Sequence, residues 1–202
     1  MTEKEVLEVA SKMVHIGPRT GFAKSIYTEA NKMPKDCRIL DIGGFMGGSS
    51  ITMALTVKDR GGLVYTINPS FTPEGDKNKK YLDMGMPLAG DLDSFMGFVK
   101  TFGAEGYVIP LIGSSEEILA KHDGSLFDMV FIDAWHVYEA TKIDVKWLDY
   151  TKENAIAQFD DFAGGVEKAA TEYFSEHKEW KRITDQAFYH KHGVAVFQKG
   201  DF

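Results

Sequence analysis

A short apolar run followed by four closely spaced glycines constrains the fold of this chain more than any other segment. The segment reads Arg38-Ile-Leu-Asp-Ile-Gly-Gly-Phe-Met-Gly-Gly-Ser-Ser50. Its apolar part is typical of a buried parallel strand. The glycines allow a tight turn that residues with side chains make less readily, and the two serines can cap a helix. We therefore expect a strand, a turn and a helix, the first unit of a nucleotide-binding α/β sheet; a tight turn without a ligand is the alternative.

Length and composition suit one α/β domain over residues 1–202. The chain is 44% hydrophobic and 26% charged, which allows a sizeable core. The net charge of −7 argues against a nonspecific nucleic-acid binder, which needs a basic surface. No apolar run approaches the length of a membrane span, and the first residues lack a signal-peptide pattern. Because Cys37 is the only cysteine, no intrachain disulfide can form. We expect a cytoplasmic protein without nucleic-acid or membrane partners.

Strands and helices alternate along the chain, which predicts a doubly wound, Rossmann-like parallel sheet. Helices are expected at 3–14, 20–31, 48–58, 92–102, from 114, from 133 to about 149, and at 164–175. Strands are expected at 37–42, 63–67, 107–112, 127–133, 155–159, 180–185 and 194–199. The last two strands are joined too closely to enclose a helix, so we expect them to pair antiparallel.

Two segments stand outside this pattern. Residues 69–90 contain three prolines and three glycines, and so long an irregular insertion is usually functional or mobile. We predict a lid or substrate loop there; a disordered surface excursion is the alternative. The N-terminal helices within residues 1–35 could form a dimer surface or a lid, so a homodimer is a further expectation.

Carboxylates follow two of the expected strands. Asp133 ends the fourth strand, and Asp160 and Asp161 follow the fifth. Neighbouring parallel strands lie about 5 Å apart, and ligands bind beyond their carboxyl ends, so we expect the three to converge. Carboxylates this close raise one another's pKa unless a cation neutralises them, and a hard divalent ion such as Mg²⁺ suits oxygen ligands best. The alternative is that one caps a helix and another faces solvent.

Two motifs resemble known families. Asp41-x-Gly43-x-x-x-Gly47 resembles motif I of the class I S-adenosylmethionine-dependent methyltransferases, whereas a dinucleotide fingerprint would need glycine at Phe45. Phe131-Ile-Asp-x-x-His-x-Tyr-Glu139, Asp160-Asp161 and Gly165-Val-x-x-Ala169 together resemble the metal-dependent small-molecule O-methyltransferases. This group contains the macrocin and mycinamicin sugar O-methyltransferases and a related cephalosporin-biosynthesis protein, and the catechol O-methyltransferases share the arrangement. The resemblance covers about residues 37–170.

The resemblance implies a seven-stranded sheet of order 3-2-1-4-5-7-6 with strand 7 antiparallel. It implies Mg²⁺, or another hard divalent ion, on Asp133, Asp160 and Asp161, with His136 as the catalytic base; a surface or packing histidine is the alternative. It also implies S-adenosylmethionine beside the ends of strands 1 to 4. We assign its binding to Asp41, Gly43, Gly47, Ser49, Asn68, Gly113, Ser114, Ser115, Asp133 and Trp135.

Several of these residues have a second interpretation. Asn68 stands where an acid often holds the ribose hydroxyls, and a neutral amide is a weaker acceptor; it could instead be a turn residue. Ser114 and Ser115 could cap a helix and no more. Trp135 could cover the adenine, wall the acceptor site or belong to the core.

The sequence thus predicts an S-adenosylmethionine-dependent, Mg²⁺-assisted O-methyltransferase for a small hydroxylated molecule, either a sugar or a phenol or catechol. The alternative is an S-adenosylmethionine-binding protein of the same fold without transferase activity. The glycine spacing counts against a third possibility, a nicotinamide-dependent oxidoreductase.

Overall fold

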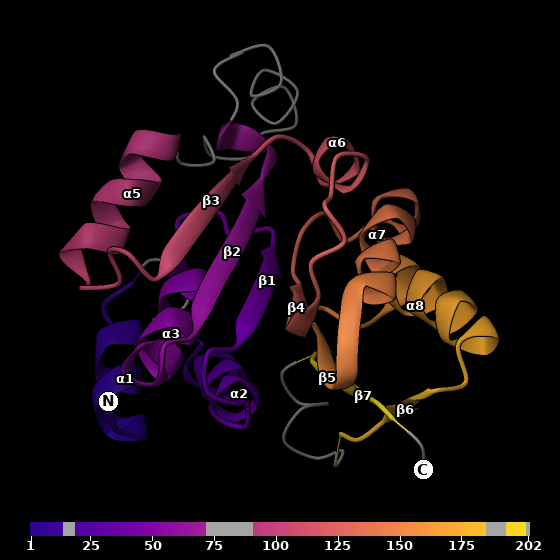
Figure 1. Ribbon diagram of the computed structural model, residues 1–202, viewed down its shortest axis with the longest axis horizontal. Helices are drawn as coiled ribbons and strands as arrows, with labels where there is room; N and C mark the ends of the chain where they lie inside the picture. Colours follow the sequence, from indigo (N-terminus) through magenta and orange to yellow (C-terminus); the bar gives the residue numbers. More distant parts are fainter. Residues whose placement is uncertain (14–18, 72–90, 185–192, 201–202) are drawn as a thin grey trace.

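A seven-stranded sheet runs through the centre of the protein, in the order β3-β2-β1-β4-β5-β7-β6 (Figure 1). The computed structural model describes residues 1–13, 19–71, 91–184 and 193–200. The strands are β1 (Arg38–Ile42), β2 (Leu63–Asn68), β3 (Val108–Ile112), β4 (Phe127–Ile132), β5 (Thr151–Phe159), β6 (Trp180–Arg182) and β7 (Ala195–Lys199). Strands β1 to β5 are parallel to one another, and β7 is antiparallel to both β5 and β6. The predicted strand order and the antiparallel seventh strand are confirmed.

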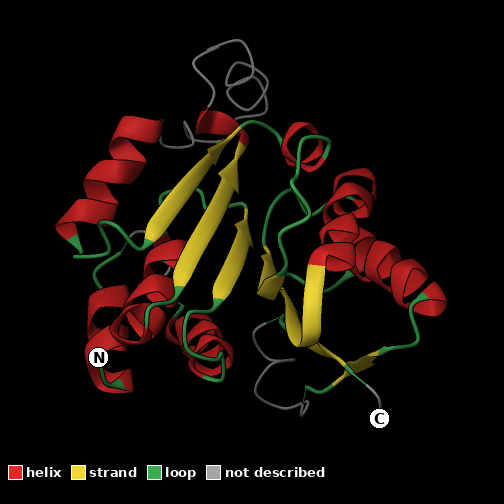
Figure 2. Cartoon of the chain, viewed as in Figure 1, coloured by secondary structure: helices red, strands yellow, loops and turns green. Residues whose placement is uncertain are grey.

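Helices cover both faces of the sheet (Figure 2). The α-helices are α1 (Glu3–Ala10), α2 (Thr20–Asn31), α3 (Gly48–Val57), α5 (Leu92–Thr101), α6 (Ser115–Leu119), α7 (Tyr138–Asp144) and α8 (Gly164–Glu176). Short 3₁₀ helices are η1 (Lys58–Arg60), η2 (Pro69–Phe71) and η3 (Val145–Tyr150). Successive residues of β1 point to opposite faces. Ile39 packs in the core formed with α1, α2, α3 and α5, whereas Leu40 packs in the core formed with η3 and α8.

The two N-terminal helices bury their apolar sides within the chain. Val6 of α1 and Phe22 and Ile26 of α2 are at most 2% exposed and belong to the core that also contains residues of α3. The residues that suggested a dimer surface or a lid are therefore used in packing against the sheet. A homodimer remains a prediction.

Some element boundaries differ from the prediction. Strand β5 begins at Thr151 rather than at 155, although the intervening residues are polar. Asn154 adopts a positive φ of 62°, and the pairing shifts register between Phe127 and Met129, so a kink carries the strand across this stretch. Helix α1 ends at Ala10 rather than at 14, and β6 ends at Arg182 rather than at 185.

The helix expected to follow β4 as far as 149 is two pieces, α7 and η3. Most of the predicted lid, residues 72–90, lies outside the described residues. In the part of the chain that is described, every helix is too short or too polar to cross a membrane.

Candidate functional site

The predicted site residues meet where β1, β4 and β5 end. Ile42 of β1 pairs with Ile132 of β4, and Ile132 pairs with Phe159 of β5. The next residues therefore leave the sheet together. Asp133 donates its backbone N–H to Ile42 at 2.9 Å, and Asp160 donates its own to Ile132 at 3.0 Å. These ladder bonds place the two aspartates side by side, as the sequence predicted.

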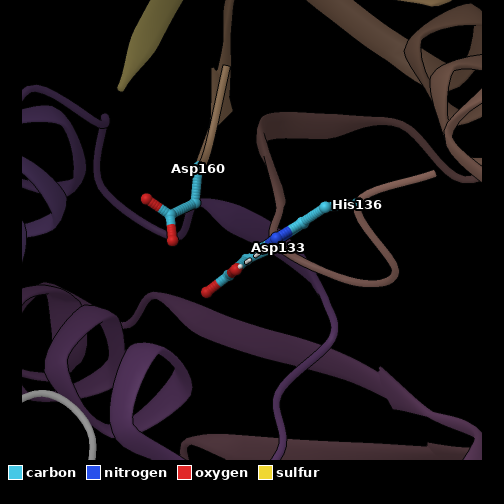
Figure 3. A group of neighbouring side chains, drawn as sticks. All are labelled: Asp133, His136 and Asp160. Atoms are coloured by element: carbon cyan, nitrogen blue, oxygen red, sulfur yellow. Dashed lines mark hydrogen bonds and ion pairs between the residues drawn. The ribbon is translucent and has the colours of Figure 1, made fainter. Parts of the chain in front are cut away.

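Asp133, His136 and Asp160 form a compact group of possible metal ligands (Figure 3). One donor atom from each residue lies within 4.8 Å of the other two. His136 Nε2 is 3.2 Å from Asp133 Oδ1. Carboxylate oxygens and an imidazole nitrogen are suitable ligands for Mg²⁺, Mn²⁺ or Zn²⁺. The group therefore fits a divalent cation in both its chemistry and its size.

The electrostatics of this group favour a positive partner. Burial, together with the neighbouring Asp160 charge, raises the pKa of Asp133 to about 7, against the lowering effect of His136. Burial also raises the pKa of Asp160, which is 1% exposed. The hydrogen bond to Asp133 raises the pKa of His136. The raised pKa of His136 shows that the surrounding carboxylates stabilise an added positive charge.

Asp161 lies beside this group rather than within it. Its side chain is 55% exposed, and its Oδ2 is 2.9 Å from His136 Nδ1. Both ring nitrogens of His136 therefore face carboxylates, one from Asp133 and one from Asp161. This arrangement stabilises the protonated imidazole, so His136 would act as a base only after these contacts loosen. The assignment of Asp161 as a metal ligand remains a prediction.

Arg19 is a site residue that the sequence analysis missed. Its Nη1 and Nη2 donate to the two oxygens of Asp160, each at 3.0 Å. The guanidinium also lies 4.1 Å from the centre of the Phe22 ring. No motif contains Arg19, and 141 residues separate it from Asp160. The signal available was chemical, because three converging carboxylates call for a cation and an arginine stands just before the helix predicted at 20–31.

The glycine turn has a structural role that the motif does not reveal. Gly43 has φ +105°, and a Cβ there would lie 2.1 Å from the backbone oxygen of Asp133. Gly47 has φ +87° and directly precedes α3. The motif resemblance attributes these glycines to cofactor approach. At Gly43 the close neighbour is the backbone of Asp133, directly after β4. The absence of a side chain at Gly43 therefore lets the turn pack against the carboxylate group.

Asp41, in β1 just before this turn, has two carboxylate oxygens with different surroundings. Its Oδ2 accepts hydrogen bonds from Ser49 Oγ, at 2.8 Å, and from Ser50 Oγ. Its buried Oδ1 has no donor among the described residues. Burial raises the pKa of Asp41 to about 6, against the lowering effect of the two serines. A buried acceptor without a donor is costly, so the turn fits a ligand that brings a hydrogen-bond donor.

The remaining predicted cofactor residues lie at the ends of β2, β3 and β4. Asn68 is 5% exposed and donates through Nδ2 to Phe45 O at 3.1 Å, which ties the end of β2 to the glycine turn. Trp135 is half-buried in the loop after β4. Gly113 has φ +143° and follows β3 directly. These residues lie around the carboxyl ends of the strands, and their assignment to the cofactor remains a prediction.

The two serines after β3 use their hydroxyls within the protein. Ser114 caps α6 in a reciprocal pair with Glu117. Ser115 Oγ accepts a hydrogen bond from Trp147 Nε1 at 3.0 Å. Burial raises the pKa of Asp144 to about 6, against the lowering effect of a hydrogen bond from Ser115. The capping interpretation of Ser114 is therefore correct as far as its hydroxyl is concerned.

The sequence profile of a methyltransferase domain family matches residues 40–162. This segment is more than half of the chain and contains the glycine turn, Asp133, His136, Asp160 and Asp161. The chain therefore belongs to this methyltransferase family. No curated protein matches it in sequence.

Solved structures of O-methyltransferases share the whole fold. The O-methyltransferase TomG from Streptomyces achromogenes, solved with S-adenosylmethionine, is 20% identical with a TM-score of 0.67, and the match covers 99% of this chain and 92% of TomG. The O-methyltransferase NovP is 17% identical with a TM-score of 0.70, over 90% of this chain and 81% of NovP. A Bacillus cereus O-methyltransferase, solved with S-adenosylhomocysteine, is 17% identical with a TM-score of 0.65, over 98% and 90%. At these identities the likeness establishes the fold.

Proposed function

We propose that this methyltransferase uses S-adenosylmethionine to methylate a hydroxyl group of a small molecule, with help from a divalent cation. The observation that carries the proposal is the group formed by Asp133, His136 and Asp160, which stands directly against the glycine turn. The presence of S-adenosylmethionine or its product in the TomG and Bacillus cereus structures supports the choice of cofactor. A sugar, or a phenol or catechol, is the proposed acceptor class.

We assign the cofactor to the turn and its surroundings. Asp41 would accept a hydrogen bond from the cofactor through its unpaired Oδ1. Asn68, Gly113 and Trp135 would line the neighbouring strand ends, together with the turn residues Gly43, Gly47 and Ser49. The hydroxyls of Ser114 and Ser115 are already bonded, so these residues would shape the adenine corner without bonding the ring through their side chains.

We assign the cation and the acceptor to the carboxylate group. A divalent ion held by Asp133 and Asp160, with Asp161 completing the set, would supply a Lewis acid that lowers the pKa of an acceptor hydroxyl. His136 would take the proton of that hydroxyl. The imidazole of His136 must be neutral for this step. Asp133 and Asp161, which now stabilise the protonated imidazole, would then have to bind the cation instead.

The alternative is a protein that binds S-adenosylmethionine without transferring the methyl group. One observation favours it. The Arg19 guanidinium already neutralises Asp160, and both nitrogens of His136 are already engaged. In that case the carboxylates would be a structural ion-pair network, and no cation would bind.

Two titrations of the intact protein test the proposal. Calorimetry with S-adenosylhomocysteine measures cofactor binding, and titration of Mn²⁺, followed by the spin-resonance signal of the free ion, measures the cation site. We expect one equivalent of each to bind, with Mn²⁺ displaced by Mg²⁺. Failure to bind S-adenosylhomocysteine would contradict the proposal as a whole, and failure to bind Mn²⁺ would remove the cation from it.

A further inference from the structure

Arg19 links the N-terminal helices to the carboxylates at the ends of β4 and β5. Its guanidinium forms a bidentate ion pair with Asp160, in which both N···O distances are 3.0 Å. The Asp160 side chain is 1% exposed and that of Arg19 is 42% exposed. Paired hydrogen bonds between charged groups are stronger than neutral ones, and the buried end of this pair is little screened by solvent. Asp160 therefore has a strong resident partner.

The same carboxylate belongs to the group that suits a divalent cation. The donor atoms of Asp133, His136 and Asp160 lie within 4.8 Å of one another. An ion among them would share Asp160 with the guanidinium, and the two positive charges would repel each other at short range. One carboxylate cannot fully stabilise both cations, so the occupancy of one weakens the other.

The protein can release Asp160 by moving one side chain. The backbone carbonyl of Arg19 accepts hydrogen bonds from Phe22 N, at 2.9 Å, and Ala23 N, at 3.1 Å. The first turn of α2 therefore fixes the backbone of Arg19. The side chain rests on the Phe22 ring and is partly exposed, and a long arginine side chain can keep its stem packed while its charged end turns to solvent.

We propose that Arg19 is a built-in counter-ion that competes with the divalent cation for Asp160, so that binding of the ion breaks the Arg19–Asp160 pair. This inference rests on the cation site of the proposed function. It has two consequences. Without a divalent ion, Arg19 offsets the cost of burying the Asp160 charge. With the ion, Arg19 lowers the affinity below what the carboxylates alone would give, and its guanidinium is freed at the rim of the site.

The test compares Mn²⁺ binding by the wild type and by Arg19→Met, with S-adenosylhomocysteine present. Methionine keeps an unbranched apolar stem against Phe22 and removes the charge. Removing a charged hydrogen-bonding competitor should tighten Mn²⁺ binding by about 10- to 100-fold. Without metal, Arg19→Met should also melt at a lower temperature than the wild type. Added Mn²⁺ should raise the melting temperature of Arg19→Met by more than it raises that of the wild type.

Two further variants serve as controls. Arg19→Lys keeps the charge but loses the planar fork, so its affinity should lie between those of the wild type and Arg19→Met. Lys24→Met removes a charge of the same sign from α2, where Lys24 is 52% exposed and pairs with Glu3 at 3.4 Å. This variant should bind Mn²⁺ as the wild type does.

Three results would overturn the competition. Weaker Mn²⁺ binding by Arg19→Met would show that Arg19 orients Asp160 for the ion. Unchanged binding would show that the ion and the guanidinium do not interact. Both results leave the proposed function intact. If neither protein binds Mn²⁺ while both bind S-adenosylhomocysteine, the cation itself is absent from the function and the competition falls with it.

Discussion

Two buried carboxylates at the ends of β1 and β5 are stabilised in different ways. Asp41 is bonded by the hydroxyls of Ser49 and Ser50, which follow it by eight and nine residues. Asp160 is paired with the full charge of Arg19, 141 residues away. Hydroxyl groups are neutral donors and leave the pKa of Asp41 raised to about 6. The glycine-turn half of the site therefore holds one carboxylate among neutral donors and suits hydrogen bonding, whereas the carboxylate half gathers several ligand-type groups in one place and suits a cation.

The substitution with the largest expected effect on activity tests whether the two halves of the site act separately. Asp133→Asn removes a carboxylate from the cation group and leaves the turn in place. Because a bound metal contributes several kcal/mol to transition-state stabilisation, methyl transfer should fall by about 10³-fold or more. Calorimetry should show near-normal affinity for S-adenosylhomocysteine and lost affinity for Mn²⁺. Equal loss of both ligands would mean that the two halves are not separable.

The difference between the halves also explains what could be predicted from the sequence. Asp41, the glycines and the serines lie within ten residues, so their proximity follows from local chain geometry. Alternation of strands and helices predicts that β4 and β5 are neighbours, which brings Asp133 and Asp160 together. Arg19 reaches Asp160 only through the packing of α2 on the sheet. The spacing of residues along the sequence does not predict the contact between Arg19 and Asp160. Nor does it predict that Gly43 lies against Asp133.

His136→Ala tests the role of the histidine within the carboxylate half. Loss of a general base should lower turnover by about 10²- to 10³-fold. The loss should shrink at high pH, because the acceptor hydroxyl then ionises without help. A pH–rate profile and Mn²⁺ titration would check both points. Unchanged turnover at neutral pH would exclude His136 as the base, and a large loss of Mn²⁺ affinity would assign it as a ligand instead.

Gly43→Ala tests the junction between the halves. A Cβ at this position would meet the Asp133 backbone at 2.1 Å, and φ is +105°. Strain and overpacking should together lower the free energy of unfolding by about 3 kcal/mol or more. Gly97→Ala is the matched control, because Gly97 lies on the exposed side of helix α5 and no neighbouring atom lies within 4 Å of the added carbon. That change should stabilise the protein by about 0.5–1 kcal/mol. Equal denaturation midpoints for the two variants would be inconsistent with this packing.

Asp41→Asn should have a smaller effect, confined to the glycine-turn half. Losing the carboxylate should weaken S-adenosylhomocysteine binding by about 10-fold and leave Mn²⁺ affinity unchanged. Unaltered cofactor affinity would mean that Oδ1 does not face the cofactor.

Titration of the Asp41 carboxyl group should also make the stability of the protein depend on pH. The pKa of Asp41 is raised from its ordinary 3.8 to about 6, so the folded protein holds this proton more tightly than the unfolded chain. The stabilisation is complete below about pH 4 and is lost as the pH rises through about 6. The stability of the wild type relative to Asp41→Asn should therefore fall by about 2 kcal/mol between pH 4 and pH 6, and by about 3 kcal/mol over the whole transition. Urea denaturation across this range measures the difference, and parallel curves would contradict it.

The most direct test of the account measures methyl transfer by the metal-depleted wild type with and without added Mg²⁺. Labelled S-adenosylmethionine is offered with a panel of phenols, catechols and sugars, and labelled methyl ethers are counted. We predict transfer to a hydroxyl of at least one acceptor class, restored by Mg²⁺ and abolished by chelation. Transfer at the same rate in the exhaustively depleted protein would show that the carboxylates of β4 and β5 serve the structure, and the cation-assisted mechanism would be wrong.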